Sequence, residues 1–174
     1  MESSILRSAN RGGPANRRRR GNQIIEFAFV LVPLFGLLFG IIDFSFAIFV
    51  RSTLEHSVRE GVRYAATYQL KTGKCQVDSV KDVVQASAMG FLAGTKREKI
   101  QVRFFNPEVD PLTGNFTEIT AAGNNPGNIV EVSVENYSHS FMVPLYWGKD
   151  PMRVNVRSAD RLEGLAAGTS PPCR

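Results

Sequence analysis

The hydrophobic residues of this chain form one long unbroken run near the N-terminus and shorter patterned stretches beyond it. From Ile24 to Val50 almost every residue is apolar, and the main interruptions are Glu26, Asp43 and Ser45. A helix needs about 20 apolar residues to cross a bilayer. The run therefore predicts a transmembrane helix.

Beyond Arg51 the apolar run gives way to an amphipathic pattern. Apolar or small residues recur at helical spacing and form one narrow stripe, with Glu55 and Arg59 on the opposite face. The stripe consists of Leu54, Val58, Gly61, Ala65 and Tyr68. Helix signals persist from Asn22 to about Leu70, with a kink expected at Pro33. We expect one continuous helix that begins in the membrane and ends as the backing helix of a folded domain.

The second half of the chain predicts a shorter helix and a small sheet. Asp78 is the expected N-cap of this helix, and Gly94 its end. Three strand-like runs follow, at Ile100 to Phe105, Ile129 to Glu135 and Met152 to Ala159. The segment 106–128 between the first two is either a binding loop or a short hairpin. A second connection, 137–151, contains aromatic residues. The expected fold class is α+β, with a domain of a second helix and a small antiparallel sheet against the long helix.

These patterns divide the chain into three parts. Residues 1–21 are a basic leader without apolar periodicity, predicted to be disordered. Residues 22–70 are the long helix, predicted to span the membrane to about residue 50. Residues 71–174 are predicted to form the domain on the far side.

Charge is concentrated in the leader. The whole chain has a formal net charge of +5, and residues 1–21 contain six arginines and one glutamate. The remainder is therefore balanced, which argues against nucleic-acid binding because a binder needs basic groups on its folded surface. Arg17 to Arg20 precede the apolar run directly, so they predict a cytoplasmic N-terminus and an extracytoplasmic C-terminal domain.

Two cysteines, Cys75 and Cys173, lie in the predicted outer domain. An oxidising compartment permits a disulfide, and closing a loop of about 100 residues contributes on the order of 4–5 kcal/mol in the chain-entropy model. The alternative is that Cys173 is a free thiol in a frayed segment. Sequence alone leaves both open.

The junction between leader and apolar helix resembles a prepilin-type signal. Cleavage after Gly21 would leave Asn22 as the first residue and Glu26 as the fifth. The stretch from Gly21 to Phe27 is similar to the Gly, four residues, Glu, Tyr/Phe pattern of Flp/Tad pilins and pseudopilins. The resemblance implies that a prepilin peptidase trims the chain after Gly21.

The resemblance continues through the helix. Glu26-Phe27-Ala28-Phe29-Val30-Leu31-Val32-Pro33 resembles the Glu-Phe-Ala-Leu-x-x-Pro stretch of TadE-like proteins. Ile42-Asp43-Phe44 and Arg59-Glu60-Gly61-Val62-Arg63-Tyr64-Ala65-Ala66 resemble their later segments, with Val62 where the family prefers Ala. The match covers Arg20 to Thr67. It implies a minor pseudopilin of a bacterial Flp/Tad-type pilus or related secretion apparatus, located in the inner membrane and possessing no cofactor or catalytic activity. The implied partners are the prepilin peptidase, a TadF-like pseudopilin, the Flp pilin, the inner-membrane platform proteins and, indirectly, the ATPase.

Glu26 is the sharpest functional candidate. A carboxylate inside an apolar segment costs a few kcal/mol unless it is paired, and ionisable residues there are functional by default. The resemblance implies that Glu26 pairs with the N-terminal amine of a neighbouring subunit. The alternative is a glutamate at the cytoplasmic boundary that reaches back to the headgroups.

Other helix residues are weaker candidates for packing. Asp43 lies about 26 Å beyond Glu26 at helical rise, so it is either an interfacial aspartate or a subunit-packing residue. Gly36 and Gly40 form a small-xxx-small pair that would admit another helix. Gly61 and Ala65 are expected to permit close packing against the domain's own sheet.

Catalytic and metal-binding patterns are lacking in the sequence. His56 and His139 have no flanking ligands at metal spacing. The stretch from Asp110 to Asn115 has too few oxygen ligands for an EF-hand. The rival to the pseudopilin hypothesis is a single-pass, membrane-anchored binding module whose ligand is held by the loops 106–128 and 137–151.

Overall fold

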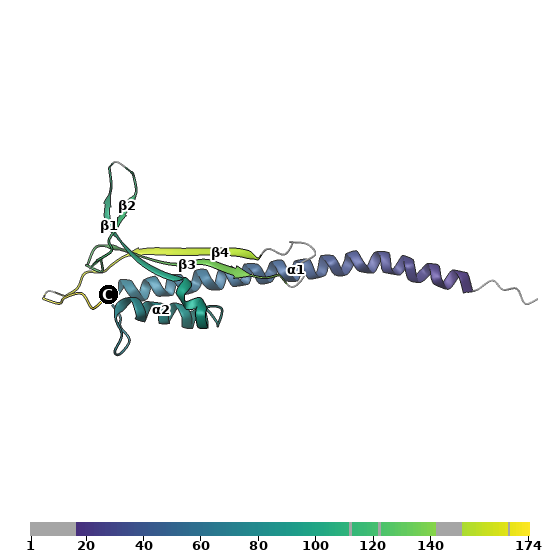
Figure 1. Ribbon diagram of the computed structural model, residues 1–174, viewed down its shortest axis with the longest axis horizontal. Helices are drawn as coiled ribbons and strands as arrows, with labels where there is room; N and C mark the ends of the chain where they lie inside the picture. Colours follow the sequence, from purple (N-terminus) through teal and green to yellow (C-terminus); the bar gives the residue numbers. More distant parts are fainter. Residues whose placement is uncertain (1–16, 112, 122, 142–150, 167) are drawn as a thin grey trace, which may run out of the picture. The chain divides into compact units, whose positions relative to one another are not determined.

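Two compact units divide the chain, and the long helix α1 (Arg17–Ala66) contributes residues to both (Figure 1). The computed structural model describes residues 17–111, 113–121, 123–141, 151–166 and 168–174, with side chains from residue 23 onward. Unit 1 ends at Ile41, and unit 2 is Ile42–Arg174. Most of the predicted leader and residues 142–150 of the second expected loop lie outside the described residues.

Unit 1 contains the apolar part of α1. Its residues from Gln23 to Ile41 are exposed, apart from the half-buried Leu31, Gly36 and Gly40. The helical assignment continues through Pro33. Within the described residues, α1 is the helix that is long and apolar enough to cross a membrane. The sequence prediction of a long apolar N-terminal helix is confirmed.

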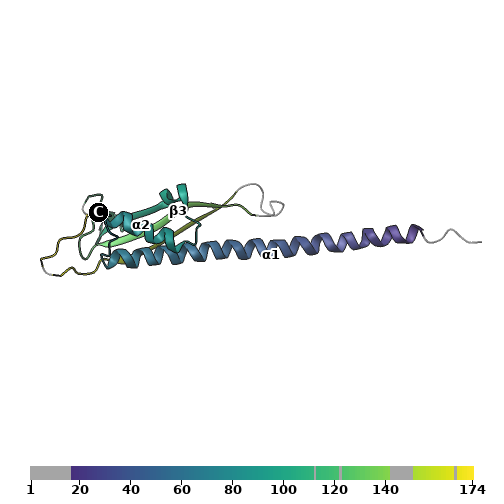
Figure 2. The ribbon, with the colours of Figure 1, turned by 90° about the horizontal axis from the view of Figure 1, so that it is seen from below.

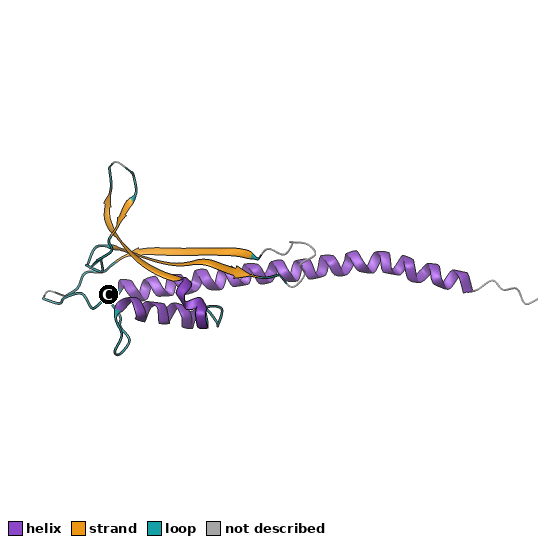
Figure 3. Cartoon of the chain, in the orientation of Figure 1, coloured by secondary structure: helices purple, strands orange, loops and turns teal. Residues whose placement is uncertain are grey.

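Unit 2 combines the end of α1 with a second helix and a sheet (Figure 3). Its further elements are α2 (Gln76–Ser87), the 3₁₀ helix η1 (Gly94–Lys99), β1 (Ile100–Val109), β2 (Phe116–Glu118), β3 (Ile129–His139) and β4 (Met152–Arg161). The strands are ordered β2-β1-β3-β4, and each neighbouring pair is antiparallel. The predicted α+β class with a small antiparallel sheet is confirmed.

The core of unit 2 lies between one face of the sheet and the two helices (Figure 2). Val130, Val132 and Val134 of β3 alternate inward, as the sequence predicts, and are fully buried. The predicted stripe of α1 supplies Leu54, Val58 and Ala65 to the same cluster. Burial of each of these valine and leucine side chains stabilises the fold by about 1.5–3 kcal/mol.

The last turn of α1 ends earlier than Leu70. Tyr68 adopts a left-handed backbone conformation with φ 54°. The amide of Gln69 donates to the carbonyl of Tyr64 at 3.3 Å, and that of Tyr68 donates to the carbonyl of Ala65 at 3.1 Å. These two bonds are the Schellman pattern, which terminates a helix. Glycine usually occupies the left-handed position, so the tyrosine gave no sequence signal.

The bounds predicted for the second helix were wrong at both ends. Cys75 is the N-cap of α2, and Asp78 lies in the first turn. The helix ends at Ser87, well before Gly94, because Met89 and Gly90 take left-handed conformations with φ 49° and 88°. A chain that enters this region at two successive residues cannot continue a right-handed helix.

β3 extends beyond the predicted Glu135 because a bulge resets its alternation. The register shifts between Val134 and Tyr137, and Asn136 has a left-handed φ of 54°. After the extra residue, Tyr137 faces the core opposite Val154. Even-numbered residues point inward before the bulge and odd-numbered residues after it. A strict two-residue period therefore ends the predicted strand too early.

The segment 106–128 contains a short hairpin rather than only a loop. β1 continues to Val109 and pairs with β2, with Phe105 opposite Glu118 and Val109 opposite Phe116. Figure 1 shows this hairpin extending away from the rest of the sheet. The structure thus selects the second of the two sequence alternatives.

Three segments of unit 2 are joined electrostatically at Asp82 of α2. Its carboxylate pairs with Arg97 at 2.8 Å and Lys74 at 2.5 Å, and lies 3.9 Å from Lys71. The hydrogen bond from Lys74 and the surrounding positive charges hold the pKa of Asp82 below its usual range. Asp82 therefore connects α2 to the preceding loop and to η1.

Candidate functional site

The predicted processing and assembly residues lie on one stretch of α1. Gly21 and Asn22 are within the helical backbone of α1. The side chains of Glu26 and Pro33 are exposed, and Phe27 is 65% exposed. A shallow apolar groove beside them is lined by Ile25, Ala28, Phe29, Val32 and Pro33. An apolar helix face that is open in the isolated chain is available to lipid or to another apolar helix.

Gly36 and Gly40 are half-buried positions of the same helix. A Cβ built on Gly40 would meet no other group within 4 Å in the described part of the chain. The described structure thus gives this glycine no intramolecular packing role. Its use as an approach site for another helix stays a prediction.

Asp43 is buried within unit 2, with 3% of its surface exposed. It begins a buried stripe that continues with Ala47 and Val50. The domain therefore covers α1 about seven residues before the apolar run ends. Sequence reasoning placed Asp43 at the hydrocarbon edge, but it could not show that the domain itself surrounds this position.

Gly61 and Ala65 lie where α1 packs against the rest of unit 2. A Cβ on Gly61 would lie 2.3 Å from Cγ2 of Val84 and 3.6 Å from Cγ1 of Val132. The nearest neighbour is therefore α2, and the sheet, which the sequence analysis expected, is the second. Ala65 is fully buried, and its carbonyl accepts a hydrogen bond from Nε2 of Gln76 at 3.0 Å.

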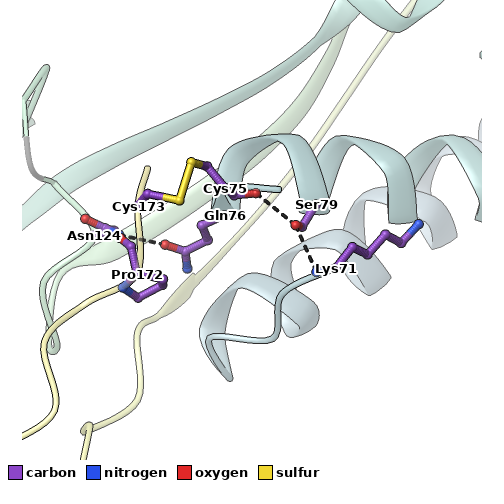
Figure 4. The surroundings of a disulfide bond; sticks show 7 residues. All are labelled: Lys71, Cys75, Gln76, Ser79, Asn124, Pro172 and Cys173. Carbon is purple, nitrogen blue, oxygen red and sulfur yellow. Dashed lines mark hydrogen bonds between the residues drawn. A yellow bond between two sulfur atoms is a disulfide. The ribbon is translucent and has the colours of Figure 1, made fainter. Parts of the chain in front are cut away.

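A disulfide joins Cys75 and Cys173 across 98 residues (Figure 4). The amide of Gln76 donates to the carbonyl of Cys173 at 2.8 Å. Asn124 donates through Nδ2 to Oε1 of Gln76 at 2.9 Å and to the carbonyl of Pro172 at 2.8 Å. The bond thus fixes the segment around Cys173 against the start of α2.

Gln76 and Asn124 were missed by sequence reasoning. Gln76 is fully buried, and its amide links the carbonyl of Ala65 at the end of α1 to Asn124. The hydroxyl of Tyr68 donates to the carbonyl of Asn124 at 3.0 Å. Buried amides are stable when both ends are hydrogen-bonded, as here. Their residue types are common in surface loops, so nothing in the sequence distinguished them.

The face of the sheet opposite the helices carries mixed charges. Arg103 pairs with Glu135 at 2.9 Å and lies 3.8 Å from Glu131. A surface groove that includes Arg103 and Glu131 is also lined by the apolar residues Phe105, Phe116 and Ile129. It takes Asn115, Phe116 and Glu118 from the segment 106–128, one of the two loops that the alternative binding-module hypothesis invokes.

The two histidines lie in different surroundings. His56 is exposed on α1, and the ring of His139 lies 5.2 Å from that of Phe46. Among the described residues, no group of three or more His, Cys, Asp or Glu side chains is arranged to hold a metal ion.

An apolar helix followed by one small α+β unit fits a single-pass membrane protein. The family model described as TadE-like protein matches residues 21–63. This match confirms the resemblance that the sequence analysis drew from Gly21, Glu26 and the residues after them. No curated protein matches the chain. No solved structure matches it either.

Proposed function

We propose that this protein is a minor pseudopilin of a Flp/Tad-type pilus or related secretion apparatus. A prepilin peptidase trims it after Gly21, the helix from Asn22 anchors it in the bacterial inner membrane, and the domain folds on the extracytoplasmic side. Its function is structural, with no reaction of its own. Its partners are a TadF-like pseudopilin, the Flp pilin and the inner-membrane platform.

One observation carries this proposal: the family match covers residues 21–63, which include the Gly21 junction and Glu26. A TadE-like segment indicates association with the Tad pilus machinery. The exposed apolar surface of α1 supports the membrane anchor because about 20 residues from Gln23 onward span about 30 Å. The carboxylate of Glu26, three residues into this span, supports an assembly role because it requires a partner in lipid.

Processing after Gly21 is tested by the N-terminal sequence of the membrane-extracted protein. In cells with an active prepilin peptidase, the chain is expected to begin at Asn22. Gly21→Val is expected to block trimming because a branched side chain replaces a residue without Cβ beside the scissile bond. Gly13→Val is the matched control and should be trimmed normally. A native chain that retains its arginine-rich leader would contradict the proposal and favour the membrane-anchored binding module.

The assembly role of Glu26 is tested by removing its charge while keeping its shape. Glu26→Gln is expected to be trimmed and to accumulate in the membrane, but to abolish pilus assembly because the carboxylate can no longer pair with an amine. Sheared filament protein measures assembly, and Glu118→Gln, on an exposed strand of the outer domain, is the control. Normal piliation in the Glu26→Gln strain would remove Glu26 from the mechanism.

A further inference from the structure

The two sides of α1 stop being exposed and apolar at different positions along the helix. On the side that faces the domain, burial begins at Asp43 and continues through Ala47 and Val50. On the other side the helix stays apolar and exposed, with Phe44 at 57% and Ile48 at 53%. Ser45 is the one polar residue on this side before Arg51, and polar residues become frequent from Arg51 onward. Residues 43–50 are therefore covered by the domain on one side and open and apolar on the other.

Exposed apolar residues at this height indicate how far the lipid reaches. Transfer of a helix face that carries Phe44 and Ile48 from water into lipid lowers the free energy. Residues 43–50 rise by about 10 Å along the helix. Each headgroup region of a bilayer is about 5–8 Å thick, and interfacial segments penetrate by about 5–10 Å. The part of the domain that covers residues 43–50 therefore lies at the depth of the headgroups.

The covering part of the domain is itself apolar. The ring of Phe91, after α2, lies 6.1 Å from that of Phe49 and 6.3 Å from that of Phe46. His139, at the end of β3, lies 5.2 Å from Phe46 and 5.8 Å from Phe141 by ring centroids. Figures 1 and 2 show the C-terminal ends of α2 and β3 at the same end of the domain. We call this cluster the apolar end; its ring members are Phe46, Phe49, Phe91, His139 and Phe141, and we count with it Met89, which precedes Phe91 by two residues.

Met89 is the most exposed member of the apolar end. It follows the end of α2 and is 71% exposed. Basic side chains stand next to this end: Arg51 and Arg153 line a shallow surface groove together with Met152. Aromatic and apolar groups flanked by arginines are typical of surfaces that lie at a membrane interface.

We propose that the apolar end is a lipid-contacting surface that rests in the headgroup layer of the outer leaflet. The occupant is the phospholipid bilayer, because Phe44 and Ile48 keep α1 apolar and exposed at the height of the apolar end, and Arg51 and Arg153 beside it complement anionic headgroups. The domain is thereby held on the membrane surface in addition to its covalent link to the helix. This inference rests on the membrane anchor of the proposed function.

The test compares the depths of three fluorescent probes in the full-length chain. Single cysteines replace Met89, Asn115 of the β1–β2 hairpin, and Phe35 of the apolar helix, in separate variants carrying an environment-sensitive dye. The native cysteines are bonded to each other and do not react with the dye. The proteins are placed in phosphatidylethanolamine/phosphatidylglycerol vesicles that contain phospholipids brominated near the headgroup end of the acyl chain, for the probes at 89 and 115, or near its methyl end, for the probe at 35.

The expected result is blue-shifted emission and bromolipid quenching for the probe at 89, at least about twofold stronger than at 115. Quenching at 35 without quenching at 89 would overturn the inference and leave the membrane anchor intact. Lack of quenching at 35 as well would overturn the anchor itself, and the proposed function with it. A blue shift at 89 that appears only at high protein density would assign the surface to a second copy of the chain and would also overturn the inference.

Discussion

A Gly61→Val variant is expected to lose about 3 kcal/mol of unfolding free energy or to fail to fold. A Cβ at this position would already lie 2.3 Å from Cγ2 of Val84, and Val84 is fully buried. Valine is stiff at χ1, so Val84 cannot move aside without disturbing α2. Overpacking of this kind typically costs 1–3 kcal/mol, occasionally more. Urea unfolding followed by circular dichroism in detergent micelles measures the loss.

The smaller Gly61→Ala change keeps the test informative if the valine variant does not fold. Alanine favours a helix over glycine by about 1 kcal/mol, so a net loss of stability would show that the close approach outweighs propensity. Removing the opposing methyl groups with Val84→Ala should recover part of the loss, with a coupling of about 1–2 kcal/mol. Gly40→Ala, which meets nothing within 4 Å among the described residues, is the control. Strict additivity of Gly61→Ala and Val84→Ala would contradict the packing argument.

Replacing Cys75 and Cys173 together with serine is expected to destabilise the domain by about 4–5 kcal/mol in the chain-entropy model. The bond closes a sequence separation of 98 residues, and the hydrogen bonds of Gln76 and Asn124 depend on the segment that it holds. Urea unfolding of the native chain with and without a reductant should show the same loss as the double variant.

The double variant is its own control because a reductant should leave its unfolding midpoint unchanged. A second variant separates the contribution of the disulfide from that of the neighbouring hydrogen bonds. Asn124→Ala in the oxidised chain removes the side-chain hydrogen bonds of Asn124 and keeps the disulfide, and it should lower the free energy of unfolding by about 1–3 kcal/mol. A double variant as stable as the native chain would show that the unfolded state is already restricted near these residues.

The helical parts of the fold were largely predictable, because a stripe at helical spacing needs only local information. Leu54, Val58 and Ala65 are buried where the pattern placed them. The ends of helices were not predictable from the same pattern. Tyr68 takes a left-handed conformation that glycine usually supplies, so this helix end carries no stop signal. At the end of α2 a stop signal was present in Gly90, which follows Met89, but the prediction placed the end at Gly94.

The sheet was predicted as far as its alternation stays regular. Asn136 inserts one residue into β3 and exchanges the inward and outward positions beyond it. Only pairing with β4 reveals that Tyr137 belongs to the core. The β1–β2 hairpin was recognised as one of two alternatives because the length of the segment exceeded that of an ordinary loop.

The residues of the candidate site also divide into those that the local sequence identifies and those that only the folded structure reveals. Gly21 and Glu26 were identified from a local pattern that the family match supports. The burial of Asp43 and the contact between Phe91 and Phe46 depend on the tertiary structure, so they could not be predicted from the sequence. The predicted end at Gly94 places Phe91 inside the second helix, whereas α2 ends at Ser87.

If the domain is exported as proposed, the long spacing of the disulfide has a consequence for the order of events. If the chain emerges from its N-terminal side, Cys75 reaches the oxidising compartment 98 residues before Cys173. During that interval its thiol has no correct partner to react with. Because the sequence contains only two cysteines, an error cannot occur within one molecule and must link two molecules. Mispairing should therefore rise with the crowding of newly exported chains.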